Sequence, residues 1–116
     1  MQSVLRMVLV DPCNGTREEL KRSLAGLDPV WVEAECAHYG ELTDVLNQTS
    51  PDIVVIDIDS DPAPALDMVS HVLRTHRNAR IFVTSGVTDS QRILQAMRCG
   101  AHEYLTTPVQ MDDLAP

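Results

Sequence analysis

The sequence predicts an α/β fold in which a five-stranded parallel sheet is covered by helices on both faces. Three observations predict it. Short aliphatic runs alternate along the chain with amphipathic stretches at helical spacing. The strongest runs are nearly continuous in apolar character, which is typical of strands buried on both faces of a parallel sheet. The chain has 116 residues, 44% of them hydrophobic, and is therefore the size of one domain with its own core.

Five stretches of the chain predict strands. The strongest are Val4–Val10, Ile53–Ile56 and Arg80–Thr84, which are rich in β-branched and aliphatic residues. Trp31–Cys36 and His102–Thr106 are more polar, so we expect them nearer the edges of the sheet. The predicted core residues of the strands are Val8, Val10, Val54, Ile56, Ile81 and Val83.

The first two predicted helices follow the first two strands. Thr16 and Glu19 have the spacing of a capping box, which predicts the start of the first helix. The second helix is closed by the turn residues 47–51. The apolar stripes that we expect to be buried are Leu20, Leu24 and Leu27 in the first helix and Leu42, Val45 and Leu46 in the second.

Two further helices are predicted before the last strand. The third begins near Pro62 or Pro64, because proline suits a first helical turn. The fourth opens at Thr88, with Gln91 as its capping-box partner, and closes at the C-cap glycine Gly100. Their expected buried stripes are Leu66, Val69, Val72 and Leu73 in the third helix and Ile93, Leu94 and Met97 in the fourth.

Composition excludes several classes of partner and site. The net charge of -8 opposes binding to nucleic acid, and the apolar runs are far shorter than the roughly 18 residues of a membrane span. We therefore expect no nucleic-acid partner and no membrane insertion. Cys13, Cys36 and Cys99 are widely spaced, so neither a disulfide framework nor a zinc site is indicated. A reducing cytoplasmic location fits best.

Polar residues follow four of the predicted strands. In open α/β sheets, ligands bind beyond the carboxyl ends of the strands, at the point where the strand order reverses. If the order is 2-1-3-4-5, as in flavodoxin-like folds, strands one, three, four and five are neighbours and their polar ends converge. The residues concerned are Asp11; Asp57, Asp59 and Asp61; Thr84 and Ser85; and Thr107 and Pro108.

Taken in order, these motifs resemble the receiver (CheY-like) domains of two-component response regulators over nearly the whole chain. Residues 51–57 (PDIVVID) resemble the family's third strand, and residues 100–108 (GAHEYLTTP) resemble its GADDYLTKP segment. The resemblance implies a doubly wound, flavodoxin-like sheet of order 2-1-3-4-5. The roles that it implies are phosphoacceptor for Asp57, pocket hydroxyl for Thr84, switch aromatic for Tyr104 and cis-proline for Pro108.

Two differences from the family pattern concern residues that would take part in phosphorylation. Receivers end strand one with adjacent carboxylates that hold Mg²⁺, whereas Asp11 is followed here by Pro12. They also carry a lysine before the last proline, whereas Thr107 leaves only a hydroxyl there. We expect the acidic pocket of Asp11, Asp57 and Asp59 to bind Mg²⁺ weakly or not at all and phosphorylation to be impaired. Asp11 could equally cap the loop into the first helix.

Residues 95–105 (QAMRCGAHEYL), with the incomplete acidic pocket, resemble the atypical receivers, or pseudo-receivers, at the N-terminus of CpaE/TadZ-type pilus assembly proteins. In those proteins a ParA/MinD-like ATPase follows. No GxxxxGK[ST] phosphate loop occurs here, so such an ATPase would lie beyond Pro116. A fifth helix is expected to begin at Met111–Leu114, where the given sequence ends, so we expect this helix to be truncated or absent. Residues 1–116 are expected to be one receiver-like domain at the N-terminal end of a longer protein.

The leading hypothesis is a non-enzymatic signalling or assembly module that binds protein through its fourth helix and fifth strand, a surface also suited to a homodimer. Its partner would be a histidine kinase or a pilus assembly ATPase component. The alternative is a working receiver phosphorylated on Asp57 with Mg²⁺, in which Asp59 or Asp61 replaces the missing acid. A flavodoxin-like cofactor binder is disfavoured, because residues 13–15 (CNG) do not form a glycine-rich phosphate loop.

Overall fold

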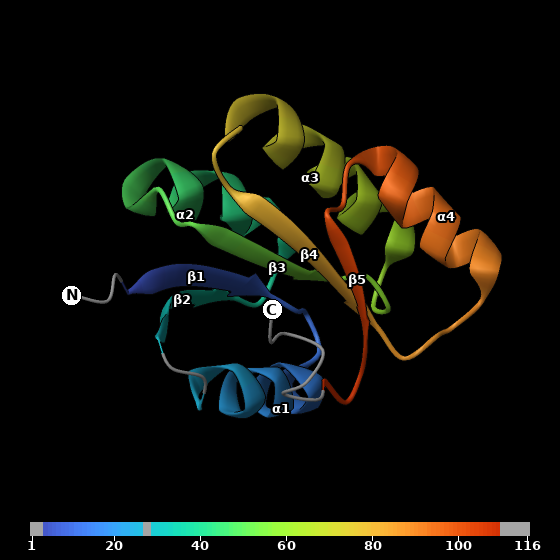
Figure 1. Cartoon of the computed structure of the whole chain (residues 1–116), viewed down its shortest axis with the longest axis horizontal. Helices are drawn as coiled ribbons and strands as arrows, with labels where there is room; N and C mark the ends of the chain where they lie inside the picture. The colour runs from blue at the N-terminus through green and yellow to red at the C-terminus, as the bar shows by residue number, and fades with distance from the viewer. Residues whose placement is uncertain (1–3, 27–28, 110–116) are drawn as a thin grey trace.

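The computed structural model describes residues 4–26 and 29–109 and shows the predicted α/β architecture (Figure 1). All five strands are parallel and form one sheet in the order β2-β1-β3-β4-β5. The predicted strand order and the two edge strands are thereby confirmed. The strands are β1 (Leu5–Val10), β2 (Val30–Cys36), β3 (Ile53–Asp57), β4 (Arg80–Ser85) and β5 (Glu103–Thr106).

Helices cover both faces of the sheet. In Figure 1, α1 lies on one face and α2, α3 and α4 lie on the other. A short 3₁₀ helix, η1, directly precedes α2. The bounds are α1 (Asn14–Ala25), η1 (Tyr39–Glu41), α2 (Leu42–Thr49), α3 (Pro62–Thr75) and α4 (Ser90–Cys99). None of the described helices is long and apolar enough to cross a membrane.

The core has two parts, one on each face of the sheet. The larger part lies against α2, α3 and α4, and the smaller part lies against α1. Every residue of β3 is buried, which fits the continuous apolar run of that strand. The six core residues predicted in the strands are fully buried, at 0% exposure: Val8, Val10, Val54, Ile56, Ile81 and Val83.

Both predicted capping boxes are wrong. Helix α1 begins at Asn14, two residues before Thr16, and its N-cap residue Cys13 makes no side-chain cap bond. Thr16 is thus the third residue of the helix and not its cap, and its hydroxyl donates to the Asp11 carboxylate. Helix α4 is capped by Asp89, whose carboxylate accepts from the backbone N–H of Gln91. Aspartate is among the best N-cap residues, which explains its selection over the neighbouring threonine.

The predicted stripes are buried in part. In α2, Leu42 and Leu46 are buried and Val45 is half-buried. In α3, Leu66, Val69 and Val72 are buried, but Leu73 is 40% exposed. Helix α4 differs most, since its inner side is centred on Ala96, and Leu94 and Met97 are 49% and 42% exposed. A small alanine brings the helix close to the sheet, and residues on its far side then face outward. Leu20 and Leu24 of α1 are buried.

Two predicted features lie outside the described residues. They are Leu27, the last member of the first stripe, and the fifth helix at Met111–Leu114. The C-cap of α4 is confirmed at Gly100, which has a φ of 120°. A Cβ atom there would lie 2.4 Å from Cδ2 of Leu73, so glycine is required by the close approach of α3 as well as by the backbone conformation.

Truncation of the central strand should destabilise the fold strongly. Ile56→Ala removes a fully buried side chain, and we expect a loss of about 2–5 kcal/mol in the free energy of unfolding. The control is Val4→Ala, at a position that is 57% exposed, where a change within about 0.5 kcal/mol is expected. Urea denaturation measures both. Equal midpoints for Ile56→Ala and the wild-type protein would contradict the burial.

Candidate functional site

Four polar residues are buried at the carboxyl ends of the central strands. Asp11 follows β1, Asp57 ends β3, and Thr84 and Ser85 end β4; each is at most 3% exposed. The parallel register of β3 and β4 places Asp57 directly opposite Thr84. The structure therefore brings together the residues predicted from the ends of strands one, three and four.

The Asp57 carboxylate has two hydrogen-bond donors. The Thr84 hydroxyl donates to Oδ2 over 2.9 Å, and the backbone N–H of Asp59 donates to Oδ1 over 3.1 Å. A third bond reaches the backbone, because the Tyr39 hydroxyl donates to the Asp57 carbonyl oxygen over 2.7 Å. Tyr39 lies in η1 and is 9% exposed. These bonds hold both the side chain and the main chain at the end of β3.

Burial changes the acidity of this site. It raises the pKa of Asp57 from 3.8 to about 6, and the nearby Asp11 carboxylate raises it as well. The bonds from Asp59 and Thr84 act in the opposite direction, because they stabilise the ionised form. Burial also raises the pKa of Tyr39 to about 12, so its hydroxyl keeps its proton and donates. Near neutral pH, Asp57 must therefore bear a costly buried charge or acquire a proton or a cation.

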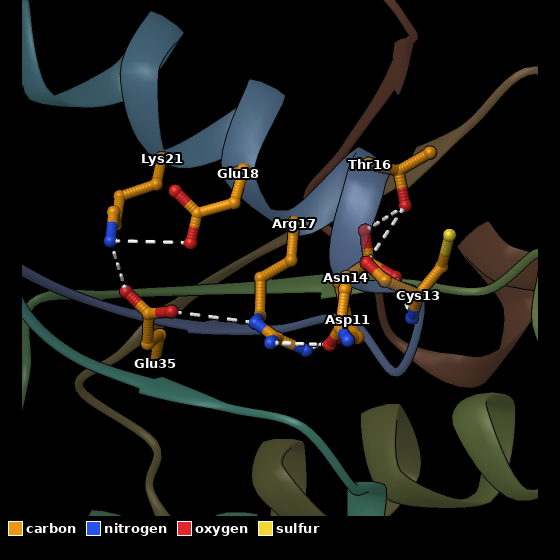
Figure 2. Close-up of polar contacts among 8 residues, drawn as sticks. All are labelled: Asp11, Cys13, Asn14, Thr16, Arg17, Glu18, Lys21 and Glu35. Atoms are coloured by element: carbon orange, nitrogen blue, oxygen red, sulfur yellow. Dashed lines mark hydrogen bonds and ion pairs between the residues drawn. The ribbon is translucent and has the colours of Figure 1, made fainter.

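Asp11 caps the loop that leads into α1 (Figure 2). Its Oδ1 accepts from the backbone N–H of Cys13 over 3.0 Å, and its Oδ2 accepts from the Thr16 hydroxyl over 2.5 Å. Arg17 closes the same loop, since it donates to the Asp11 carbonyl oxygen over 2.9 Å and to Oδ1 of Asn14 over 2.7 Å. Asp11 thus lies in the pocket and also performs the capping role that the sequence left open.

Two basic residues of α1 are directed toward β2. Arg17 and Lys21 both pair with Glu35, at 3.4 Å and 3.0 Å, as Figure 2 shows. Arg92 of α4 pairs with Asp59 at 3.4 Å. Within the described ranges, no lysine or arginine forms an ion pair with the Asp57 carboxylate. The pocket therefore has no direct cationic partner there for Asp57.

Asp59 contacts the loop between β4 and α4. Its Oδ1 accepts from the Ser85 hydroxyl, and its Oδ2 accepts from the backbone N–H of Gly86 over 2.7 Å. Asp61, the other acid considered as a substitute ligand, is exposed and lies at the N-cap position of α3 without a side-chain cap bond. The two acids after β3 therefore have different environments, and Asp59 alone is bound to a neighbouring loop.

The carboxylates as arranged do not fit Mg²⁺, the ion that the receiver resemblance implies. Every side-chain oxygen of Asp11, Asp57 and Asp59 already accepts a hydrogen bond from the protein. Pro12 supplies no side-chain oxygen. Among the residues that the structure describes, no three histidine, cysteine, aspartate or glutamate side chains are close enough to hold a metal ion together. An octahedral ion would have to share these oxygens with their present donors and would find one carboxylate fewer than the receiver pattern supplies.

Thr107, Pro108 and Tyr104, which the sequence assigns to the site, make no hydrogen bond to the Asp57 carboxylate. Thr107 lines a hollow of about 220 Å³ between α1 and the end of β5, and Asp57 does not line that hollow. The peptide bond from Thr107 to Pro108 is cis, as expected. Tyr104 is half-buried, and its hydroxyl donates to the Val87 carbonyl oxygen over 2.6 Å. Tyr104 is thus bound to the β4–α4 loop, while the two donors to the Asp57 carboxylate are Thr84 and Asp59 rather than Thr107.

Sequence reasoning missed three residues of the site. Tyr39 lies in a 3₁₀ turn that follows an edge strand, where no motif marks it. Arg17 and Arg92 read as ordinary solvated charges on helices, but their side chains are only 13% and 28% exposed. The spacing from Asp89 to Arg92 offered a weak signal for Arg92, because it places the arginine one turn into α4 and near the ends of the strands.

Comparison with curated proteins gives relatives that are similar in length to this chain and others that are much longer. The chain is 26% identical over 107 residues to the chemotaxis protein CheY of Thermotoga maritima, covering 90% of this chain and 87% of that protein. It is also 26% identical over 107 residues to the transcriptional regulatory protein BtsR of Salmonella typhimurium, covering 92% of this chain but 44% of that protein. The chain therefore spans most of the chemotaxis protein and less than half of the transcriptional regulator.

Solved structures agree with this fold. A two-component response regulator of the LuxR family from Aurantimonas sp. SI85-9A1 matches with a TM-score of 0.84 and 31% identity, covering 97% of this chain and 80% of that one. The receiver domain of a response regulator, NarL, from Mycobacterium tuberculosis matches with a TM-score of 0.85 and 18% identity, covering 97% and 91%. A model of the response regulator receiver domain family matches residues 7–116, and this chain therefore belongs to that family.

Proposed function

We propose that this receiver domain acts as a non-enzymatic protein-interaction module and that phosphorylation of Asp57 is impaired. The observation that carries the proposal is that, among the described residues, the buried Asp57 carboxylate has neutral donors but no cationic partner. Asp11, Asp57 and Asp59 are hydrogen-bonded to protein at every side-chain oxygen, and no described lysine or arginine pairs with Asp57. Phosphoryl transfer depends on a metal ion and a cation to neutralise charge, so this arrangement disfavours it.

The surface formed by α4 and β5 is the proposed contact region. Leu94 and Met97 are 49% and 42% exposed on α4, and Val87, in the loop before that helix, is 38% exposed. Tyr104 of β5 adds a half-buried aromatic ring bonded to that same loop. Exposed apolar residues that gather on one element favour protein contact. The same surface suits either a different protein or a second copy of this chain.

The proposed setting is cytoplasmic signalling or assembly. A histidine kinase is the partner that receiver-family membership suggests, and a pilus assembly ATPase component is the partner that the resemblance of residues 95–105 to CpaE/TadZ proteins suggests. The reading frame after residue 116 distinguishes these settings. An ATPase domain there would favour assembly, and a helix-turn-helix would favour transcriptional control.

A working receiver is the alternative function. The bond between Thr84 and Asp57 supports it, because it places a hydroxyl beside the acceptor carboxylate, where a phosphoryl oxygen would need a donor. In that case Asp59 or Asp61 would supply the ligand that Pro12 lacks. If Asp59 turned toward the ion, it would lose its present bonds with Ser85 and Gly86.

Restoring the two missing charges should restore binding of a phosphoryl mimic. We expect wild-type protein to show weak Mg²⁺ binding and little response to beryllofluoride. Pro12→Asp with Thr107→Lys returns a metal ligand and a cation, and should gain Mg²⁺-dependent beryllofluoride binding about tenfold beyond the combined effect of the single variants, because groups around one ion couple. Amide chemical shifts of Asp57 and Thr84 measure this binding.

The single variants and an Asp57→Asn background are the controls for that experiment. Binding that persists when the Asp57→Asn substitution is added would be unrelated to the pocket. Tight binding of the mimic by wild-type protein would overturn the proposal and favour the working receiver. A folded double variant that remains inert would contradict missing charge as the cause of the impairment.

Asp57 should also make the stability of the protein depend on pH. Its folded-state pKa of about 6 lies above the ordinary value of 3.8, so the folded protein retains a proton that the unfolded chain releases. Stability from this group is therefore present below about pH 4 and falls as pH rises toward 6. Asp57→Asn removes the charge, so this variant should be more stable than wild type by up to roughly 3 kcal/mol at pH 7.

Urea denaturation of both proteins from pH 4 to pH 8 measures this difference. The advantage of Asp57→Asn should shrink toward zero as pH falls to 4, because both side chains are then neutral. Asp67→Asn, at an exposed position on α3, is the control and should show no such trend. A difference between wild type and Asp57→Asn that stays constant across this range would refute the raised pKa.

A further inference from the structure

We infer that Asp59 is a positioning residue that holds the β4–α4 loop and the start of α4 in one arrangement without a phosphoryl group. This deepens the proposed function and rests on it, because the held elements carry the proposed contact surface. The contacts of Asp59 with Ser85, Gly86 and Arg92 are called the Asp59 anchor below. They connect the loop after β3 to three points along the next loop and helix.

The Asp59 anchor uses both carboxylate oxygens. Oδ2 accepts from the backbone N–H of Gly86 over 2.7 Å, and Oδ1 accepts from the Ser85 hydroxyl. Nη1 of Arg92, in the first turn of α4, lies 3.4 Å from Oδ1. One side chain therefore binds the last residue of β4, the first residue of the loop and the helix that follows the loop.

Two further bonds extend the anchor along the loop. The Ser85 hydroxyl oxygen accepts from the backbone N–H of Val87 over 3.0 Å while the same hydroxyl donates to Asp59. The Tyr104 hydroxyl donates to the carbonyl oxygen of Val87 over 2.6 Å. Val87 is therefore held from both sides, by β4 through Ser85 and by β5 through Tyr104. This series of hydrogen bonds connects Asp59 through Ser85 and Val87 to Tyr104 of β5.

The strength of these contacts differs. The Gly86 bond is charge-assisted and short, and such bonds are stronger than neutral ones. The pair of Asp59 and Arg92 is weaker, because the two side chains are 39% and 28% exposed and water screens them. The backbone bond is therefore the main restraint, and Arg92 orients α4 relative to it.

The anchor is also coupled to the pocket. The backbone N–H of Asp59 donates to Oδ1 of Asp57, so the residue that binds the loop is itself positioned by the buried carboxylate. The bonds to Ser85 and Gly86 fix the orientation of the Asp59 side chain, so turning this carboxylate toward a cation beside Asp57 would break them. Holding the loop and completing a metal site are thus competing uses of one carboxylate.

Amide hydrogen exchange, followed by NMR on the unphosphorylated chain without Mg²⁺, tests the inference. Asp59→Ala should raise the exchange rates of the Gly86 and Val87 amides about tenfold or more, because one amide loses its acceptor and the other loses the oriented Ser85 hydroxyl. Arg92→Gln should raise them less than about fivefold, as expected for a partly exposed pair. Asp59→Asn retains a carbonyl oxygen and should give an intermediate rate.

Asp61→Ala is the matched control, because it removes an aspartate from the same loop that makes no side-chain cap bond. It should leave both amides within about twofold of wild type, and thermal unfolding checks that every variant remains folded. Unchanged Gly86 exchange in folded Asp59→Ala, or equal acceleration in Asp61→Ala, would overturn the inference. The measurement does not involve phosphorylation, so failure of the Asp59 anchor is distinguishable from failure of the proposed function, which the beryllofluoride experiment tests.

Discussion

The burial of acidic side chains at one edge of a parallel sheet is the constraint on which the site depends. Parallel strands bring their carboxyl ends together, so the acids after β1 and β3 become neighbours in a region that water barely reaches. Asp57 is 3% exposed and lies near the fully buried Asp11, and both conditions oppose its ionisation. Donors such as the Thr84 hydroxyl and the Asp59 amide offset part of this cost.

The hydrogen bonds that these acids accept hold the surrounding loops in their conformations. Asp11 accepts a hydrogen bond from the Thr16 hydroxyl. Thr16, which resembled a helix cap, lies inside α1, which starts two residues earlier. The Asp59 carboxylate accepts hydrogen bonds from Ser85 and Gly86, and these bonds fix the start of the loop after β4. The carboxylates that a receiver could offer to a cation therefore serve as structural acceptors here. Function and loop conformation compete for the same few oxygens.

The close packing of α4 explains why its apolar residues face outward. Ala96 is fully buried and Gly100 lies against Leu73 of α3, so the inner side of the helix is made of small residues. Leu94 and Met97 then remain exposed on the outer side of α4. On the other face, the pairs of Glu35 with Arg17 and Lys21 connect α1 to β2 at the opposite edge of the sheet.

The sequence by itself determined the parallel α/β class, the buried strand residues and the positions of Asp57 and Thr84, because apolar runs and strand ends are local features. The strand order 2-1-3-4-5 is an expectation from the resemblance to receiver domains, because no local pattern specifies which strands pair. The sequence determined neither the start of α1 nor that of α4, since side chains such as Thr16 and Asp89 compete for roles that only the folded chain decides. Tyr39 and Arg92 reach the site from distant segments, and no local pattern predicts such contacts. The tertiary structure alone decided what each carboxylate binds, because that depends on which donors fold within about 3 Å of its oxygens.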